Sequence, residues 1–259
     1  MSRRHFTFDC EGSQLAATLD EAAGSSGLLI VTGGNELRSG AWSGQAQFAD
    51  QIAEAGHPVM RFDRRGTGDS EGGNGEFHSS GPDLAAAIAA FRQHCPQLTR
   101  IMAWGNCDAA SALMLANGAG CQGLILSNPW TIEDEAAEPA PEVLRDHYRR
   151  RLTDPAAVKR LLTGKVSLRG LLSSLRGAAK AAPSEPLKGM ALEMEQGIAG
   201  FAGPVTFLIA ERDRTAHAFL AAWTRNDPRI QRCPDASHSF VEPQAREWLV
   251  ERLLEALKP

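Results

Sequence analysis

The sequence lacks several features that would assign a protein to a class at once. No apolar run among its 259 residues approaches the roughly 18 residues that span a bilayer, so we expect no membrane span. The opening residues, MSRRHFTFDCEG, lack an apolar signal core, and this predicts a cytoplasmic protein. The formal net charge is only -4, which gives no general attraction to phosphate backbones or anionic lipid. Nucleic acid is therefore not an expected partner.

Paired cysteines are also missing. The five cysteines are an odd number, lie far apart in the chain and form no CxxC pair. This spacing argues against a disulfide framework and against a zinc site, so each cysteine is interpreted singly. A lone cysteine most often serves as a small buried hydrophobic residue. We give that interpretation to four of the five, Cys10, Cys95, Cys121 and Cys233.

What the chain does contain is a repeated alternation of strand-like and helix-like segments. Residues 5–10 and 14–20 predict an opening β-hairpin, and the apolar run 27–34 ends in glycines. This alternation predicts an α/β fold, with a mostly parallel central sheet flanked by helices on both faces. The later strands are expected at 57–63, 100–104, 123–128, 204–213 and 229–233, and the helices at about 43–55, 82–94, 108–116, 214–223 and 243–257.

The alternation stops between residues 131 and 203, where helix-like, charged stretches replace the strands. We therefore predict one discontinuous core domain, residues 1–130 and 204–259, with a helical cap inserted at 131–203. In the insert, the leucines of 168–175 have helical spacing, which predicts cap packing, with an acyl-chain site as the alternative. The run RDHYRRR (145–151) predicts a solvated helix face, with recognition of an acidic partner as the alternative.

The stretch RIMAWGNCDAASALMLA, residues 100–116, holds the one cysteine with a distinctive context. A predicted strand runs into a predicted helix, and Gly105 and Ala109 lie two residues before and two after Cys107. Small residues at these positions are typical of a nucleophile elbow, usually written GxSxG, whose sharp turn holds the nucleophile above the sheet. Cys107 is therefore the candidate nucleophile, with sulfur where most such enzymes carry oxygen.

A thiol nucleophile needs a base, and the base needs an orienting acid. On a fold of this kind the expected chain order is nucleophile, acid, histidine. Asp213 ends the strand PVTFLIAERD, and His238 follows the final strand, so this pair is the candidate acid and base. Glu211 is the rival acid, a helix cap is the alternative role for Asp213, and His217 is interpreted as a surface helix residue.

The oxyanion of an acyl-transfer intermediate needs N–H donors. The elbow predicts one at the backbone of Asp108, which opens a helix where N–H groups are free. The loop TGGNE offers the second, from the amide of Gly34 or of Asn35. Glycine in such a loop permits close approach of a substrate, although Gly33 and Gly34 could also serve only to shape a turn.

With these motifs in this order, the chain resembles the α/β-hydrolases over nearly its full length. The chain more narrowly resembles the type 1 exosortase A system-associated hydrolases, on its GG loop, the turn DRRGTGDS (63–70), the elbow CDAAS (107–111) and the segments HYRRRL and KRLLTGKVSL. Ala109 and Ala210 stand where glycine is common in that group. The resemblance implies an α/β-hydrolase fold and a bacterial setting of exopolysaccharide production and PEP-CTERM protein sorting. In the turn, Arg64 and Arg65 are interpreted as structural, with substrate contact as the alternative.

Sulfur at Cys107 affects the expected substrate. A thiolate is favoured beside an imidazolium at His238, since a nearby cation stabilises the negative sulfur. Because a thiolate also leaves easily, we expect a small-molecule ester or thioester rather than an amide. The acyl-enzyme is itself a thioester, so acyl transfer is the nearest alternative to hydrolysis, and a non-catalytic ligand-binding protein is the second. The predicted mechanism requires no metal and no organic cofactor.

Overall fold

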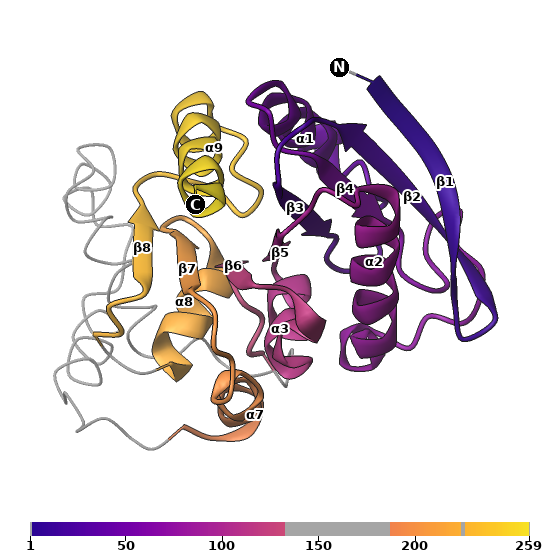
Figure 1. Ribbon diagram of the computed structural model, residues 1–259. Helices are drawn as coiled ribbons and strands as arrows, with labels where there is room; N and C mark the ends of the chain where they lie inside the picture. Colours follow the sequence, from indigo (N-terminus) through magenta and orange to yellow (C-terminus); the bar gives the residue numbers. More distant parts are fainter. Residues whose placement is uncertain (1, 133–186, 224–225, 259) are drawn as a thin grey trace, which may run out of the picture.

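The computed structural model describes residues 2–132, 187–223 and 226–258, which form one eight-stranded sheet covered by helices on both faces (Figure 1). The strand order is β1-β2-β4-β3-β5-β6-β7-β8. Strands β1 and β2 form the predicted antiparallel hairpin, β2 pairs antiparallel with β4, and every later pairing is parallel. The α/β architecture and the mostly parallel sheet predicted from the sequence are confirmed.

The strands follow the apolar runs closely, because a parallel strand covered on both faces must be apolar on both sides. Among the strands of the described residues, only β1, the first strand of the opening hairpin, is mostly exposed. The eight strands are β1 Ser2–Cys10, β2 Ser13–Glu21, β3 Ser26–Val31, β4 Val59–Phe62, β5 Arg100–Asn106, β6 Gly123–Ser127, β7 Val205–Ala210 and β8 Ile230–Cys233.

The helices begin and end within a few residues of their predicted positions. Two of them begin with proline at the first or second helical position, where a missing N–H has no cost. The described α-helices are α1 Gly44–Glu54, α2 Gly81–His94, α3 Asp108–Leu115, α7 Gly189–Ile198, α8 Arg214–Ala222 and α9 Pro243–Leu257. Short 3-10 turns lie at Ala41–Ser43, Phe77–Ser79 and Asn117–Gly120.

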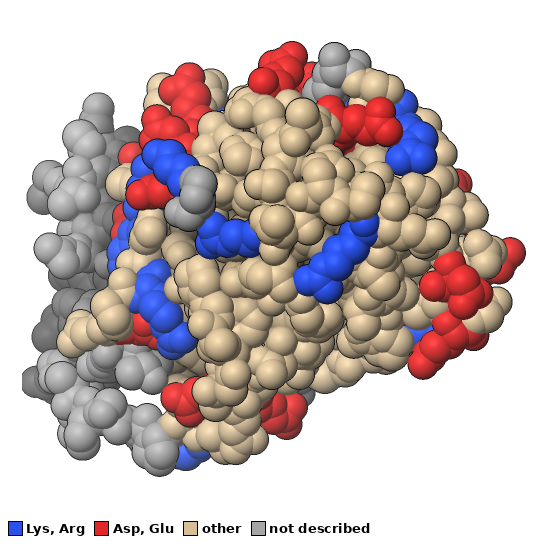
Figure 2. Space-filling view, viewed as in Figure 1, with Lys and Arg blue, Asp and Glu red and all other residues tan. Residues whose placement is uncertain are grey.

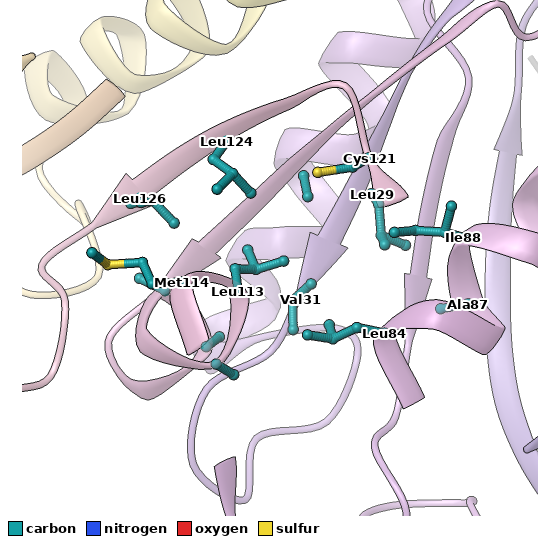
Figure 3. Close-up of a cluster of buried hydrophobic side chains, with 14 of the residues drawn as sticks. Leu29, Val31, Leu84, Ala87, Ile88, Leu113, Met114, Cys121, Leu124 and Leu126 are labelled. Carbon is teal, nitrogen blue, oxygen red and sulfur yellow. The ribbon is translucent and has the colours of Figure 1, made fainter. Parts of the chain in front are cut away.

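Two hydrophobic clusters fill the space on either side of the sheet. Alternate residues of β3 divide between them, so that Leu29 and Val31 join one cluster while Leu28 and Ile30 join the other. The first cluster packs the sheet against α2, α3, α7 and α8, and Figure 3 shows the part of it between β3, α2 and α3. The second packs the opposite face against α1 and α9. This two-sided core holds the carboxyl ends of the parallel strands in fixed positions.

Most of the predicted cap, including residues 145–152 and 166–180, lies outside the described residues. Its described part contains α7, whose Met190 and Met194 belong to the first hydrophobic cluster. At Gly197 an added Cβ would lie 2.3 Å from the carbonyl oxygen of Met114, so α7 packs directly against the end of α3.

In the described part of the chain, no helix has the length and apolar character needed to cross a membrane. Acidic and basic side chains are interspersed on the face in Figure 2.

Candidate active site

Cys107 occupies a sharp turn between β5 and α3. Its backbone has φ 64° and ψ -129°, a left-handed conformation that L-residues rarely adopt and that often marks a functional site. At Gly105 an added Cβ would lie 2.7 Å from the backbone carbon of Ala109, so only glycine fits there. Ala109 itself is buried in the core, which shows that the turn accommodates its methyl group. The local geometry is that of the predicted elbow.

The predicted acid and base lie together at Cys107. His238 Nδ1 is 2.8 Å from Asp213 Oδ2, and the Asp213 side chain is only 7% exposed. The His238 ring also shares a hydrogen bond with the Cys107 side chain. Three segments far apart in sequence therefore form a continuous chain from sulfur to imidazole to carboxylate. Each belongs to the carboxyl end of a strand or to the loop that follows it.

The pKa of His238 is raised from 6.5 to about 10. The hydrogen bond with Asp213 is the largest cause, followed by the hydrogen bond with Cys107, while burial acts in the opposite direction. The charged imidazolium is thus the favoured form at neutral pH.

Asp213 also caps a helix, which is the role that the sequence offered as the alternative to catalysis. Its carboxylate accepts hydrogen bonds from the backbone N–H groups of Thr215, at 3.2 Å, and Ala216, at 3.1 Å, and so caps α8. The cap and the contact with His238 coexist, because a carboxylate has acceptor sites for all of these donors. The rival Glu211 has its carboxylate 3.9 Å from Arg232, and the His217 ring hydrogen-bonds the Glu211 carbonyl oxygen at 2.9 Å.

Two asparagines that the sequence reasoning did not assign hold the His238 loop in place. The side-chain amides of Asn106 and Asn128 both donate to the His238 carbonyl oxygen, each at 3.2 Å. Asn128 also donates to Asn106 at 3.0 Å and accepts from the Ala210 N–H at 2.8 Å. It is fully buried with φ 44°. The sequence signal for this role was the position of Asn128 directly after an apolar strand. An asparagine buried there must have hydrogen-bond partners for its side-chain amide.

The loop after β3 approaches the elbow very closely. At Gly33 an added Cβ would lie 2.6 Å from Asp108 Oδ1 and 2.7 Å from the Asn106 carbonyl oxygen. The Gly34 N–H donates to Asp108 Oδ1 at 2.6 Å, so this amide is engaged. In contrast, the N–H groups of Asn35 and Asp108 have no acceptor among the described residues. The sequence offered the amides of Gly34 and Asn35 as alternative oxyanion donors, and in the structure the Gly34 amide already has an acceptor whereas the Asn35 amide has none among the described residues.

Arg64 ties this loop to the elbow. Its buried guanidinium donates to the Gly34 carbonyl oxygen at 2.5 Å, to Asp108 Oδ2 at 3.2 Å and to Ser80 Oγ at 3.1 Å. The neighbouring Arg65 points elsewhere and pairs with Asp83 at 2.5 Å. The two adjacent arginines therefore stabilise different regions, and Arg64 is the one that contacts the elbow, through Asp108.

The remaining cysteines are buried, as predicted, whereas Cys107 is partly exposed. Burial raises the pKa of each of these four thiols, and for three of them to about 11, which keeps the sulfur protonated and unreactive at neutral pH. Those three are Cys10, Cys121 and Cys233.

Comparisons with known proteins concern the family and the fold. Residues 28–252 match the sequence family described as the alpha/beta hydrolase family. No curated protein sequence matches the chain. Among solved structures, the Pyrococcus furiosus esterase Pf2001 is 15% identical with a TM-score of 0.62, covering 99% of this chain and 89% of that chain. The alpha/beta hydrolase GrgF from Penicillium sp. sh18 is 18% identical with a TM-score of 0.64, covering 100% and 98%.

A third similar structure is Est1E from Butyrivibrio proteoclasticus with ferulic acid bound. It is 17% identical with a TM-score of 0.58, covering 97% of this chain and 98% of that chain. At these identities the structural likeness concerns the fold.

Proposed function

The chain belongs to the alpha/beta hydrolase family, and from that premise we propose that it cleaves esters or thioesters through a covalent intermediate on Cys107. The observation that carries the proposal is the contact chain from Cys107 to His238 to Asp213, with 2.8 Å between His238 Nδ1 and Asp213 Oδ2. A nucleophile, a base and an orienting acid in this arrangement are the parts that acyl transfer needs.

In the first half of the reaction, the Cys107 sulfur bonds to the acyl carbon, and the carbonyl electrons move to the oxygen. When the tetrahedral intermediate collapses, the bond to the leaving oxygen or sulfur breaks, and His238 gives that atom a proton. Amides are disfavoured because the Cys107 thiolate leaves the intermediate more easily than an amine does. Asp213 keeps the imidazole oriented throughout and stabilises its charged form.

In the second half, His238 takes a proton from water, and the water oxygen attacks the acyl carbon of the thioester. The bond to Cys107 then breaks and releases the acid. We assign the oxyanion contacts to the N–H groups of Asp108 and Asn35, because the Gly34 N–H is held by the Asp108 carboxylate. Gly34 then shapes the loop instead of donating to the substrate.

The test is intact-mass measurement after brief exposure to p-nitrophenyl acetate and to short acyl thioesters. We expect one acyl-sized mass gain together with turnover, and we expect both to be lost in Cys107→Ala. Cys233→Ala is the matched control, because this buried thiol also lies at the carboxyl end of a strand and should not carry the acyl group. Hydroxylamine should release the adduct, as it does for thioesters.

Other outcomes would favour the alternatives. If added alcohols or amines became acylated faster than water, the protein would be an acyltransferase that uses the same intermediate. If neither adduct nor Cys107-dependent turnover appeared across the panel, the non-catalytic ligand-binding alternative would replace the enzyme.

We further propose that residues 131–203 form a cap over this site and that the protein acts in the exosortase-linked setting. The support for the setting is the elbow CDAAS and the turn DRRGTGDS, which resemble those of the exosortase-associated hydrolases. The gene neighbourhood tests it: genes for exopolysaccharide synthesis or for an exosortase should lie nearby. Their consistent absence near close homologues would contradict the setting without affecting the chemistry at Cys107.

A further inference from the structure

Glu36 is a charged side chain beside the candidate triad to which the proposed mechanism gives no role. It follows the loop that approaches the elbow, and its backbone N–H donates to the Gly33 carbonyl oxygen at 3.1 Å. Its carboxylate interacts electrostatically with both His238 and Asp108. Glu36 forms no ion pair with a lysine or arginine in the ranges that the structure describes. Burial raises the pKa of the Glu36 carboxyl above its ordinary value, and the hydrogen bond from the Ala41 backbone and the attraction of His238 only partly offset this cost of burying the charge.

Glu36 lines a small pocket that adjoins the triad. Its lining includes Asn106, which adjoins Cys107, and Ser239, which adjoins His238. The cavity volume is about 20 Å³. A site of this kind needs about 10–15 Å³ to hold one water-sized group, so there is room for one such group and not for a bulky one.

Two polar groups of this pocket, the Glu36 carboxylate and the Gln45 side-chain oxygen, accept hydrogen bonds. Gln45 is 8% exposed, and its Oε1 is a buried acceptor without a donor in the described part of the protein. Two donors of the lining are engaged elsewhere, since Trp104 Nε1 donates to Ser127 and the Asn106 amide donates to the His238 carbonyl oxygen. An occupant that satisfies both Gln45 and Glu36 must donate hydrogen bonds.

Four aromatic side chains also line the pocket and suit a positive charge. The rings of Phe48 and Trp104 meet edge to face with centroids 5.8 Å apart, and Trp42 and Phe240 also line the pocket, together with Ala41 and Gly44. Aromatic faces attract cations through their quadrupole. Trp42 already carries one, because the Arg246 guanidinium lies 4.1 Å from its ring centroid.

We propose that this pocket is a subsite for a small cationic group, a primary ammonium, on the substrate. The inference rests on the proposed function, because the pocket adjoins the residues assigned there to acyl chemistry. Glu36 supplies the opposite charge, Gln45 supplies a second acceptor, and the rings exclude water from the contact. The size of the cavity selects an ammonium over a trimethylammonium group.

The probe is ethylammonium chloride, with 1-propanol as the uncharged molecule of similar size. Binding is measured from tryptophan fluorescence at constant ionic strength, because Trp42 and Trp104 line the pocket. Inhibition of p-nitrophenyl acetate cleavage is measured in parallel. We expect ethylammonium to bind, to compete with the ester, and to do both far better than 1-propanol. Tetramethylammonium should be the weaker cation.

Glu36→Gln should weaken ethylammonium binding roughly 10- to 100-fold, the loss expected for one hydrogen bond to a charged group. Glu76→Gln is the matched control. Glu76 is exposed and lies two residues after Asn74, whose side chain contacts Asn35. Its substitution changes the net charge by the same amount as Glu36→Gln. Gln45→Met provides a second test that leaves Glu36 in place, and it should also weaken binding. Thermal unfolding establishes that each variant is folded.

Equal binding of ethylammonium and 1-propanol, or unchanged ethylammonium binding in Glu36→Gln, would overturn the subsite. The fluorescence arm needs no turnover, so the two proposals can fail separately. Glu36-dependent binding without Cys107-dependent turnover would contradict the proposed function alone. Turnover without any preference for the cation would contradict the subsite alone.

Discussion

At the scale of single residues, the candidate site depends on side chains that perform two tasks at once. Asp213 caps α8 and holds His238, and Asp108 opens α3 while its carboxylate binds the Gly34 N–H. Such double use keeps the reacting groups rigid, because each is fixed by a secondary-structure element as well as by its partner. A change at one of these residues should therefore affect both stability and chemistry.

The His238 imidazolium should contribute pH-dependent stability. Its folded pKa, about 10, lies above its ordinary value of 6.5, so the contribution is fully present below pH 6.5 and is lost as the pH rises toward 10. We expect the stability advantage of the wild type over His238→Gln, measured by urea unfolding, to shrink across this range. The buried thiols titrate in both proteins, so they cancel in the difference. An advantage that stayed constant or grew with pH would contradict the assignment.

A further variant separates the two causes of this shift. Because the hydrogen bond with Cys107 contributes to the raised pKa of His238, Cys107→Ala should move the loss of stability to lower pH. The contact with Asp213 is the larger cause, and it should keep the transition above pH 6.5.

At the scale of elements, the candidate site is made by turns that follow parallel strands. The turn after β5 presents Cys107, the loop after β3 presents Asn35, and the turn after β7 presents Asp213. These turns meet because the carboxyl ends of parallel strands share one edge of the sheet. The turn after β4 carries Arg64, which contacts both the loop after β3 and the elbow and so fixes their relative positions.

The adjacent arginines of that turn provide a matched pair of variants. Arg64→Met should leave the Asp108 carboxylate without its ion pair and displace the loop, lowering kcat about 10- to 100-fold, since small misplacements of catalytic groups are that costly. Arg65→Met should lower stability through loss of its pair with Asp83 and leave kcat nearly unchanged. The readouts are kcat per active site, counted by Cys107 acylation, and thermal unfolding.

A purely structural role for Arg64 would produce a different pattern. Both variants would then lose activity only in proportion to the fraction of unfolded protein, and kcat per active site would be the same in each. Arg64→Lys should recover part of the activity, because lysine keeps the charge but loses the forked geometry.

At the scale of the whole molecule, Asn128 links segments that are more than a hundred residues apart. It connects β5, through Asn106, to the start of the acid turn at Ala210 and to the His238 loop. The three catalytic candidates therefore share one buried hydrogen-bonded residue behind them. This linkage couples the geometry of the site to the packing of the sheet.

Asn128→Ala tests that linkage. We expect the free energy of unfolding to fall by about 2–5 kcal/mol, from the orphaned Ala210 N–H and from alanine in a left-handed conformation. Asn117→Ala is the control, because Asn117 is exposed and also left-handed, with φ 48°. It should cost only about 1–2 kcal/mol. Urea unfolding measures both, and equal losses would argue against a linking role for Asn128.

Much of this architecture was predictable from local pattern. The positions of the strands and helices followed from apolar runs and helical spacing, and the elbow followed from small residues around Cys107. These features are local because they depend on backbone sterics and on which faces are buried. The Cys107, Asp213 and His238 assignments, which stay predictions, came from chain order along such elements.

The tertiary structure decided what depends on distance between remote segments. Residues in the loop after β3 and in the elbow meet only when two parallel strands pair. The sequence therefore could not tell that Asp108 engages the Gly34 N–H, while the Asn35 N–H has no acceptor among the described residues. The same holds for Arg64, for Asn128, and for the pocket that Glu36 forms with residues of α1, β5 and the His238 loop. The order of residues along the chain determined which groups the site could contain. Packing determined which of those groups already have hydrogen-bond partners within the protein.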